Sequence, residues 1–346
     1  MYRVDWKGCG TALVTPFDEK GRIDFRALTA LVEWQIDRGI DFLVPCGTTG
    51  ESATLSGEER KGVTAAVVKA AAGRVPVIAG AGGNHTAKAV FWARDAVDAG
   101  ADGILSVSPM YNRPSPDGLV RHFSAIAEAA DVPVIVYNVP TRTGTDMDVE
   151  TILRLAEIPR VVGLKEASPN FGKIARLMTA LPEDFVVFSG EDSTALALIA
   201  LGGRGLISVA SNEIPGEMSS LVGAALEGRW DEARKLQRKY LPLMEMNFWE
   251  SSPGPAKCAL SAMGRCGDTL RLPLVPVRDD TRRRIEKLLT GLKLLSKKAA
   301  AARSSAGPAC RGSRRRSPPR SRRPRPTRMP CRRPRSDGSS RSSGRA

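Results

Sequence analysis

A lysine inside an otherwise apolar segment is the first residue of this chain that could do chemistry. Residues 161–167 read Val-Val-Gly-Leu-Lys-Glu-Ala, and Lys165 stands where a parallel strand buried on both faces would carry an apolar side chain. Free lysine has a pKa of about 10.4 and is a poor nucleophile at neutral pH, but desolvation lowers that pKa. A neutral amine can condense with a ketone to form an imine. Lys165 is therefore a candidate nucleophile.

The same segment has a second interpretation, in which Lys165 closes a strand for purely structural reasons. Its ammonium group could extend to solvent or pair with Glu166. Residues 161–167 alone do not decide between the two interpretations. The polar residues that follow the other apolar runs of the chain have to decide.

Those polar residues form a set suited to imine chemistry if they converge on one cavity. Hydroxyl groups can relay protons, backbone amides next to glycines can hold a carboxylate, and an arginine can grip a second carboxylate through two hydrogen bonds. Taken singly, each residue could equally be a turn residue, a wall aromatic or a surface cation. The candidates after the runs are Thr48, Thr49, Tyr111, Tyr137 and Arg142.

The elements that would position these residues alternate regularly along the chain. Short apolar runs rich in β-branched residues are separated by longer amphipathic segments, which predicts a parallel sheet with crossover helices. Eight such units in about two hundred residues predict a closed (β/α)8 TIM barrel, whose active site forms at the carboxyl ends of the strands. The predicted strands are 10–15, 41–46, 75–81, 103–108, 132–138, 161–167, 185–190 and 205–210.

Three regions are expected. Residues 1–212 would form the barrel, 213–296 a C-terminal helical bundle, and 297–346 a disordered tail rich in Arg, Ser and Pro. Within the barrel, Ser56 and Glu59 have the spacing of a capping box that begins the second helix, so Ser56 is expected to be structural.

Positive charge is concentrated in the predicted tail. Residues 297–346 contain seventeen Lys or Arg and one Asp, which accounts for the formal net charge of +15 and leaves the body nearly neutral. Such a tail could bind nucleic acid non-specifically through phosphate contacts, whereas a solvated extension without a selected role is the interpretation we favour. Nucleic acid is therefore not an expected partner of the folded body.

Cysteine and histidine placement excludes other classes of site. The six cysteines are scattered and favour a reducing cytoplasm over a disulfide scaffold. His85 and His122 are the only histidines and have no ligand spacing, so no metal and no other cofactor is expected. The chain has no apolar run of membrane-spanning length, and its first residues lack a signal-peptide core.

Five motifs, in order and with matching spacing, resemble the dihydrodipicolinate synthase family from about Gly8 to Leu295. This resemblance implies a TIM-barrel lyase that condenses pyruvate with L-aspartate 4-semialdehyde through a Schiff base, in diaminopimelate and lysine biosynthesis. It also implies a homotetramer built from tight dimers. The motifs are Gly-Thr-Thr-Gly-Glu-Ser at 47–52, Tyr-Asn-Arg-Pro at 111–114, Tyr-Asn-Val-Pro-Thr-Arg-Thr-Gly at 137–144, Gly-Leu-Lys-Glu at 163–166 and Gly-Leu-Ile-Ser-Val at 205–209.

Matching of motif positions assigns a role to each site residue. Lys165 would form the pyruvate imine, Tyr137 would donate and accept protons, and Thr48 with Tyr111 would complete the relay, Tyr111 entering from a neighbouring subunit. The pyruvate carboxylate and the semialdehyde carboxylate would be held by a second group of residues. Thr49, Gly190 and the backbone of Ile207 would hold the pyruvate carboxylate, and Arg142 would hold the carboxylate of the semialdehyde.

N-acetylneuraminate lyase and the 2-keto-3-deoxy sugar-acid aldolases share the lysine and tyrosine of this resemblance, and they are the alternative enzymatic interpretation. Arg142 and Tyr111 favour the synthase, because a short carboxylated aldehyde needs a cation where a sugar needs hydrogen-bonding side chains.

Regulation is one point on which this sequence departs from lysine-inhibited members of the family. Where those enzymes carry a glutamate that pairs with the ammonium group of bound lysine, this chain has Lys88. Like charges repel, so feedback inhibition by lysine is expected to be weak or absent. The other matching positions are Ser52, Ala53, Gly57, Arg60, Asn84 and Met110.

Overall fold

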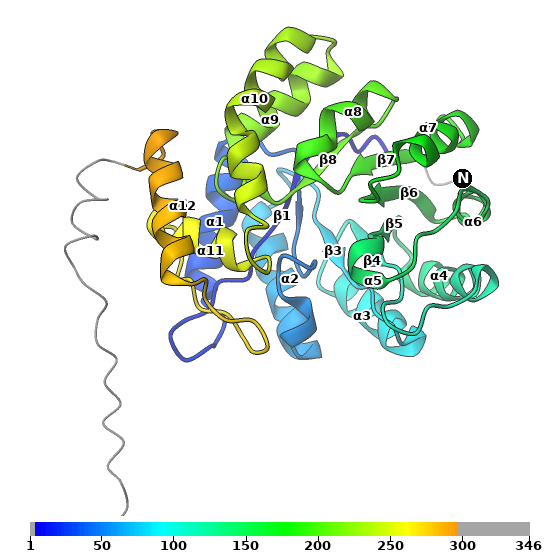
Figure 1. Cartoon of the computed structure of the whole chain (residues 1–346). Coiled ribbons are helices and arrows are strands. Elements are labelled where there is room, and N and C mark those ends of the chain that lie inside the picture. The colour runs from blue at the N-terminus through cyan, green and yellow to red at the C-terminus, as the bar shows by residue number, and fades with distance from the viewer. Residues whose placement is uncertain (1–3, 296–346) are drawn as a thin grey trace, which may run out of the picture. The chain divides into compact units, whose positions relative to one another are not determined.

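Eight parallel strands form a barrel in the computed structural model, which describes residues 4–295 (Figure 1). Neighbouring strands pair in the order β2-β1-β8-β7-β6-β5-β4-β3, and a parallel bridge between Leu43 and Val77 joins the β2 and β3 segments. The predicted (β/α)8 fold is thereby confirmed. The strands are β1 (Gly8–Ala12), β2 (Phe42–Val44), β3 (Ile78–Gly80), β4 (Gly103–Val107), β5 (Val134–Asn138), β6 (Val161–Glu166), β7 (Val186–Ser189) and β8 (Gly205–Ser208).

Helices surround the barrel. Those between strands are α1 (Phe25–Asp37), α2 (Gly57–Ala71), α3 (Thr86–Asp98), α4 (Pro116–Ala130), α5 (Pro140–Thr143), α6 (Val149–Ala156), α7 (Phe171–Ala180) and α8 (Ala195–Ala200). Short 3-10 turns are η1 (Ser52–Thr54), η2 (Asp192–Thr194) and η3 (Ala210–Asn212). After β8 come α9 (Pro215–Leu226), α10 (Trp230–Met246), α11 (Gly254–Ala262) and α12 (Asp279–Gly291).

Two apolar layers hold these elements together. One set of strand side chains fills the barrel interior, where the rings of Phe42 and Phe188 meet edge to face with centroids 5.2 Å apart. The other set packs against the helices. Burial on both faces explains why the strands read as continuous apolar runs.

The start of α2 confirms the predicted capping box. The Glu59 backbone N–H donates to Ser56 Oγ at 3.1 Å, and the Ser56 N–H donates to the Glu59 carboxylate at 2.9 Å. Ser56 therefore satisfies an unpaired backbone donor at the helix start, as expected of a structural residue.

Helix α9 follows β8 after the 3-10 turn η3 and packs beside β1 and α10, so it completes the strand and helix alternation. Helices α10, α11 and α12 extend the chain beyond that alternation. The boundary at residue 212 stays a prediction, and the predicted tail, 297–346, lies outside the described residues. No helix within residues 4–295 combines the length and apolarity that a membrane crossing requires.

Candidate active site

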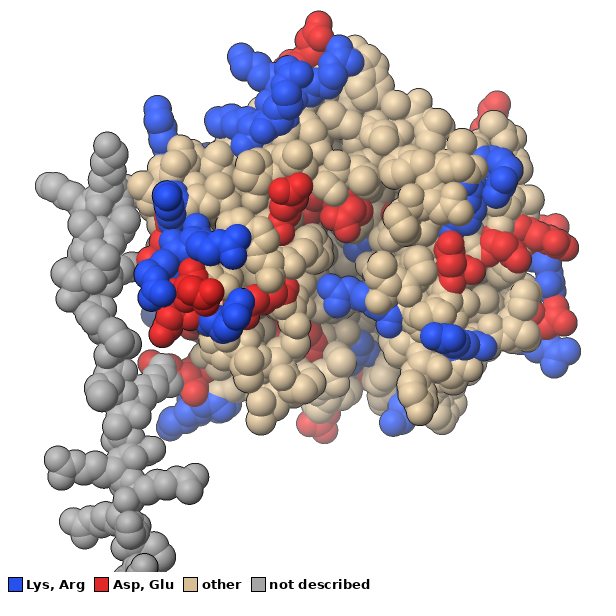
Figure 2. Space-filling view, viewed as in Figure 1, with Lys and Arg blue, Asp and Glu red and all other residues tan. Residues whose placement is uncertain are grey.

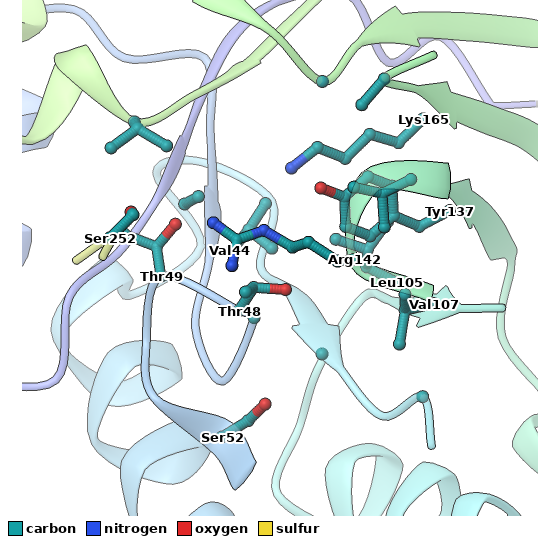
Figure 3. Close-up of a pocket in the computed structure, with 18 of the residues that line it drawn as sticks. Val44, Thr48, Thr49, Ser52, Leu105, Val107, Tyr137, Arg142, Lys165 and Ser252 are labelled. Carbon is teal, nitrogen blue, oxygen red and sulfur yellow. The ribbon is translucent and has the colours of Figure 1, made fainter. Parts of the chain in front are cut away.

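A cavity of about 330 Å³ opens at the carboxyl ends of the barrel strands. It brings together four of the predicted side chains, those of Lys165, Tyr137, Arg142 and Thr48, which point toward one space in Figure 3. Thr49 and Gly190 also line it. The space-filling view shows a hollow in this face with Lys or Arg side chains at its margin (Figure 2).

Lys165 lies on β6 and is only 5% exposed. Desolvation by burial lowers the pKa of its ammonium group to about 8. The buried carboxyl of Asp192 acts in the opposite direction and the guanidinium of Arg142 in the same direction, both more weakly than desolvation. The ammonium form still predominates at pH 7, but the neutral amine that attacks a ketone is far more abundant than for a lysine with the ordinary pKa.

Tyr137 lies on β5 directly beside Lys165 in the strand pairing. The Lys165 Nζ atom is 4.4 Å from the centroid of the Tyr137 ring. Burial raises the pKa of the Tyr137 hydroxyl to about 12, so the phenol stays protonated and can donate a hydrogen bond to a reacting group.

Asn138 follows Tyr137 and Glu166 follows Lys165, and these two residues hold the strands together on the side away from the cavity. Because side chains alternate along a strand, Asn138 and Glu166 point away from the cavity, and Asn138 Nδ2 donates to both Glu166 carboxylate oxygens at 2.9 and 3.1 Å. Lys173 of α7 pairs with the same carboxylate at 3.2 Å, and the Ser168 N–H donates to it at 2.6 Å. This buried network holds β5 and β6 in the register that places Tyr137 beside Lys165.

The loop after β2 carries Thr48 and Thr49 into the cavity, with Thr49 only 6% exposed. Thr15 Oγ1 donates to the Gly50 carbonyl at 2.7 Å and ties the loop to the segment after β1. A side chain at Gly50 would approach the Leu13 carbonyl oxygen to 3.0 Å, so glycine is needed for this close approach.

Arg142 sits on the one-turn helix α5, which sequence reasoning treated only as part of a motif. Thr143 Oγ1 donates to the Val139 carbonyl at 3.1 Å, and Gly144 ends the turn in the left-handed region with φ 75°. This turn presents the exposed guanidinium of Arg142 at the cavity mouth.

Gly190 borders the cavity so closely that a Cβ atom there would lie 3.0 Å from Lys165 Cε. Ile207, by contrast, is fully buried on β8 in the barrel interior, and its side chain does not line the cavity. The structure thus brings Gly190 next to Lys165 and leaves only the Ile207 backbone for the predicted role.

Tyr111 does not join the cavity of its own chain. Its side chain is 91% exposed, and its backbone has a φ of 73°, which a non-glycine residue rarely adopts. Within residues 4–295 the cavity lining therefore lacks one member of the predicted relay.

Phe248 and Ser252 line the cavity from the segment between α10 and α11, and sequence reasoning missed both. They lie more than eighty residues beyond Lys165 and belong to no motif, so no local signal marks them. Across the described part of the chain, no three His, Cys, Asp or Glu side chains are grouped so that they could hold a metal ion.

Comparison with known proteins gives one consistent result. The profile of the dihydrodipicolinate synthetase family matches residues 5–292. A 4-hydroxy-tetrahydrodipicolinate synthase from Koribacter versatilis is 52% identical over 283 residues, covering 82% of this chain and 94% of that protein. A protein of the same name from Acidobacterium capsulatum is 50% identical over 294 residues, covering 84% and 97%. The crystal structure of dihydrodipicolinate synthase from Aquifex aeolicus has a TM-score of 0.82 and 42% identity, and the match covers 84% of this chain and all of that one.

Proposed function

Because this chain belongs to the dihydrodipicolinate synthetase family, we propose that its cavity condenses pyruvate with L-aspartate 4-semialdehyde to give 4-hydroxy-tetrahydrodipicolinate. The enzyme is a lyase of the 4-hydroxy-tetrahydrodipicolinate synthase type, which serves diaminopimelate and lysine biosynthesis. The observation that carries the proposal is the buried Lys165, with its pKa lowered to about 8, beside the protonated hydroxyl of Tyr137.

The reaction begins on the lysine nitrogen. Neutral Lys165 Nζ adds to the ketone carbon of pyruvate, and the resulting carbinolamine loses water to form an imine. The imine withdraws electrons from the adjacent methyl group, which loses a proton and becomes an enamine. The enamine carbon then attacks the aldehyde carbon, and the oxygen formed there takes up a proton. Finally the amine of the semialdehyde attacks the imine carbon, closes the ring and releases Lys165.

Tyr137 supplies and removes protons in these steps, together with Thr48. Thr49, Gly190 and the backbone of Ile207 hold the pyruvate carboxylate next to the nucleophile. Arg142 holds the carboxylate of the semialdehyde. It lies at the cavity mouth, where the second substrate enters after pyruvate has bound. These assignments rest on motif position and on the side chains that face the cavity.

Tyr111 completes the proton relay from a neighbouring subunit in this proposal. Its exposure of 91% leaves it available to another copy of the chain, while the cavity of its own chain lacks it. The active form is then at least a dimer, and we propose a tetramer built from two such dimers. A cytoplasmic location is part of the same proposal.

The alternative acceptors are the polyhydroxylated aldehydes used by N-acetylneuraminate lyase and the sugar-acid aldolases. Arg142 is the observation against them, because its guanidinium matches a carboxylate and not a row of hydroxyl groups.

Reduction with borohydride in the presence of pyruvate tests the proposal directly. The imine is reduced to a stable amine, and peptide mass spectrometry is expected to find the adduct on Lys165 alone. An adduct on another lysine, or none, would overturn the assignment. Turnover with L-aspartate 4-semialdehyde, compared with that of sugar aldehydes, then identifies the acceptor.

A further inference from the structure

A buried carboxylate stands immediately after the loop that carries Thr48 and Thr49. The Glu51 side chain is completely inaccessible to solvent, and its backbone has a φ of 53°, in the left-handed region. A charged group rarely occupies such a place without partners. All the side-chain partners of Glu51 come from a distant part of the sequence.

Lys257 of α11 supplies the counter-charge. Its Nζ atom forms an ion pair with Glu51 Oε1 and donates to the Thr269 carbonyl at 2.9 Å, and the lysine side chain is also fully buried. The ring of Phe17 covers the ammonium group, with its centroid 4.1 Å from Nζ. The pair therefore joins the loop after β2 to α11, which lies 206 residues later in the chain.

Arg271 continues this connection along the loop. Its backbone N–H donates to Glu51 Oε2 at 3.2 Å, and its guanidinium donates to the Thr54 carbonyl at 2.9 Å. The same guanidinium makes two hydrogen bonds, 2.7 and 2.6 Å long, to the Glu59 carboxylate at the start of α2. Residues on both sides of η1 are thus fixed to one arginine.

A buried ion pair adds little to the free energy of unfolding, because the desolvation of both charges offsets their attraction. Two apolar side chains of the same volume often stabilise the fold at least as well. Ion pairs of this kind do fix geometry, since their hydrogen bonds are directional. Glu51 lies two residues after Thr49, and its backbone N–H donates to the Thr48 carbonyl at 3.1 Å, so the anchored residue is tied directly to the segment that carries both threonines.

We propose that Glu51, Lys257 and Arg271, the C-terminal clamp, are positioning residues that hold the loop of Thr48 and Thr49 in the conformation in which Thr49 binds the pyruvate carboxylate. This inference rests on the proposed function, because it takes pyruvate as the ligand of the loop. In this proposal, α11 and the segment after it contribute to catalysis by positioning the threonine loop, and Lys257 itself does not contact the substrate.

The test separates binding from chemistry and from stability. Lys257→Met keeps the length of the side chain and removes its charge, and Glu51→Gln keeps the volume and a hydrogen-bonding group. Each is expected to raise the KM for pyruvate, and the pyruvate concentration that gives half-maximal borohydride trapping, by at least tenfold. The KM for the aldehyde substrate should change less than threefold, because Arg142 lies on α5, away from the clamp. Lys257→Arg, which restores a cation, should recover part of the loss.

Arg282→Met is the matched control, because it breaks an ion pair with Asp268 in the same C-terminal region without contact to residues 47–51. It should lower the unfolding temperature and leave the KM for pyruvate unchanged. Folded clamp variants with a wild-type KM for pyruvate would overturn the proposal, and so would an equal rise in the KM for both substrates. If Lys257→Met does not fold, Glu51→Gln carries the same prediction. Absence of pyruvate trapping in the wild type would overturn the proposed function, and the clamp with it.

Discussion

The Nζ atom of Lys165 lies 4.4 Å from the centre of the Tyr137 ring, and the two residues are direct partners in the pairing of β5 with β6. Burial acts on the two groups in the same sense, because it disfavours the charged form of each. It lowers the pKa of the amine to about 8 and raises that of the phenol to about 12. One environment therefore prepares a nucleophile and a proton donor together.

Lys165→Arg is expected to reduce turnover at least about 10³-fold, since a guanidinium stays protonated and cannot form an imine. The substitution keeps the positive charge and much of the length, so it isolates nucleophilicity. Steady-state rates and borohydride trapping with pyruvate measure the effect. Trapping at the wild-type level in this variant would show that another lysine is the nucleophile.

The rate of pyruvate imine formation is expected to rise with pH and to level off above about pH 8. The amine reacts when it is deprotonated, and its pKa is lowered to about 8. Tyr137 keeps its proton over this range because its pKa is about 12. Trapping rates at low pyruvate concentration from pH 6 to pH 10 provide the profile. A rate that still rises steeply up to pH 10, as for a lysine with the ordinary pKa of about 10.4, would contradict a desolvated nucleophile.

Arg142→Ala is expected to lower kcat/KM for L-aspartate 4-semialdehyde by about 10- to 100-fold. This range corresponds to the loss of a hydrogen bond to a charged group, which contributes roughly 1.5–3 kcal/mol. Pyruvate trapping should stay close to wild type, because only the second carboxylate loses its partner. Arg142→Lys serves as the control that keeps a charge without the planar fork. Equal losses in trapping and in condensation would rule out this division of roles.

Tyr111→Phe is expected to slow turnover by about 10²-fold and to leave the unfolding temperature unchanged, because one exposed hydroxyl is removed from the proton relay. Mixing this variant with Lys165→Arg supplies a sharper measurement. If Tyr111 acts across a subunit boundary, mixed dimers contain one site with both native residues and regain activity. Mixtures that stay inactive, or a fully active monomer at high dilution, would contradict the shared site.

Free lysine is expected to inhibit weakly or not at all. At the positions that match the lysine site of sensitive relatives, Lys88 replaces an acid, and Arg60 is a buried cation whose guanidinium stacks 4.0 Å from the Trp92 ring centroid. Among residues 4–295, the Nε and Nη1 atoms of Arg60 have no hydrogen-bond partner, so its guanidinium is a second cation that would repel bound lysine. Initial rates across a lysine titration, with both substrates near their KM, check this. Strong inhibition below 1 mM, an order-of-magnitude threshold for tight effector binding, would refute it.

Much of the fold and site could be predicted because their signals are local. The run at 161–167 is apolar because β6 is buried on both faces, and Ser56 with Glu59 lie within one helical turn. The sequence did not predict helix α5 next to the site, because four residues are too few to show the helical period of apolar side chains.

The rest of the site depends on contacts that no local pattern records. Lys257 and Glu51 are 206 residues apart, and neither sits in a segment whose periodicity indicates a partner. Phe248 and Ser252 reach the cavity only because the chain turns back between α10 and α11. Tyr111 was predicted from its place after an apolar run and from its motif, and the proposed function assigns its exposed side chain to the site of a second subunit.

The placement of Arg142 on α5, outside the strand ladder, has a consequence for how such enzymes diversify. The proposed nucleophile and proton donor, Lys165 and Tyr137, are fixed by strand pairing and by the network of Asn138 and Glu166, whereas the residue proposed to recognise the acceptor sits on a separate turn. Exchange of that turn can alter acceptor choice while imine formation is preserved. The architecture is therefore modular for directed evolution, and libraries confined to 140–142, which keep the buried Thr143 and the left-handed Gly144, should yield new acceptor specificities with little loss of folding.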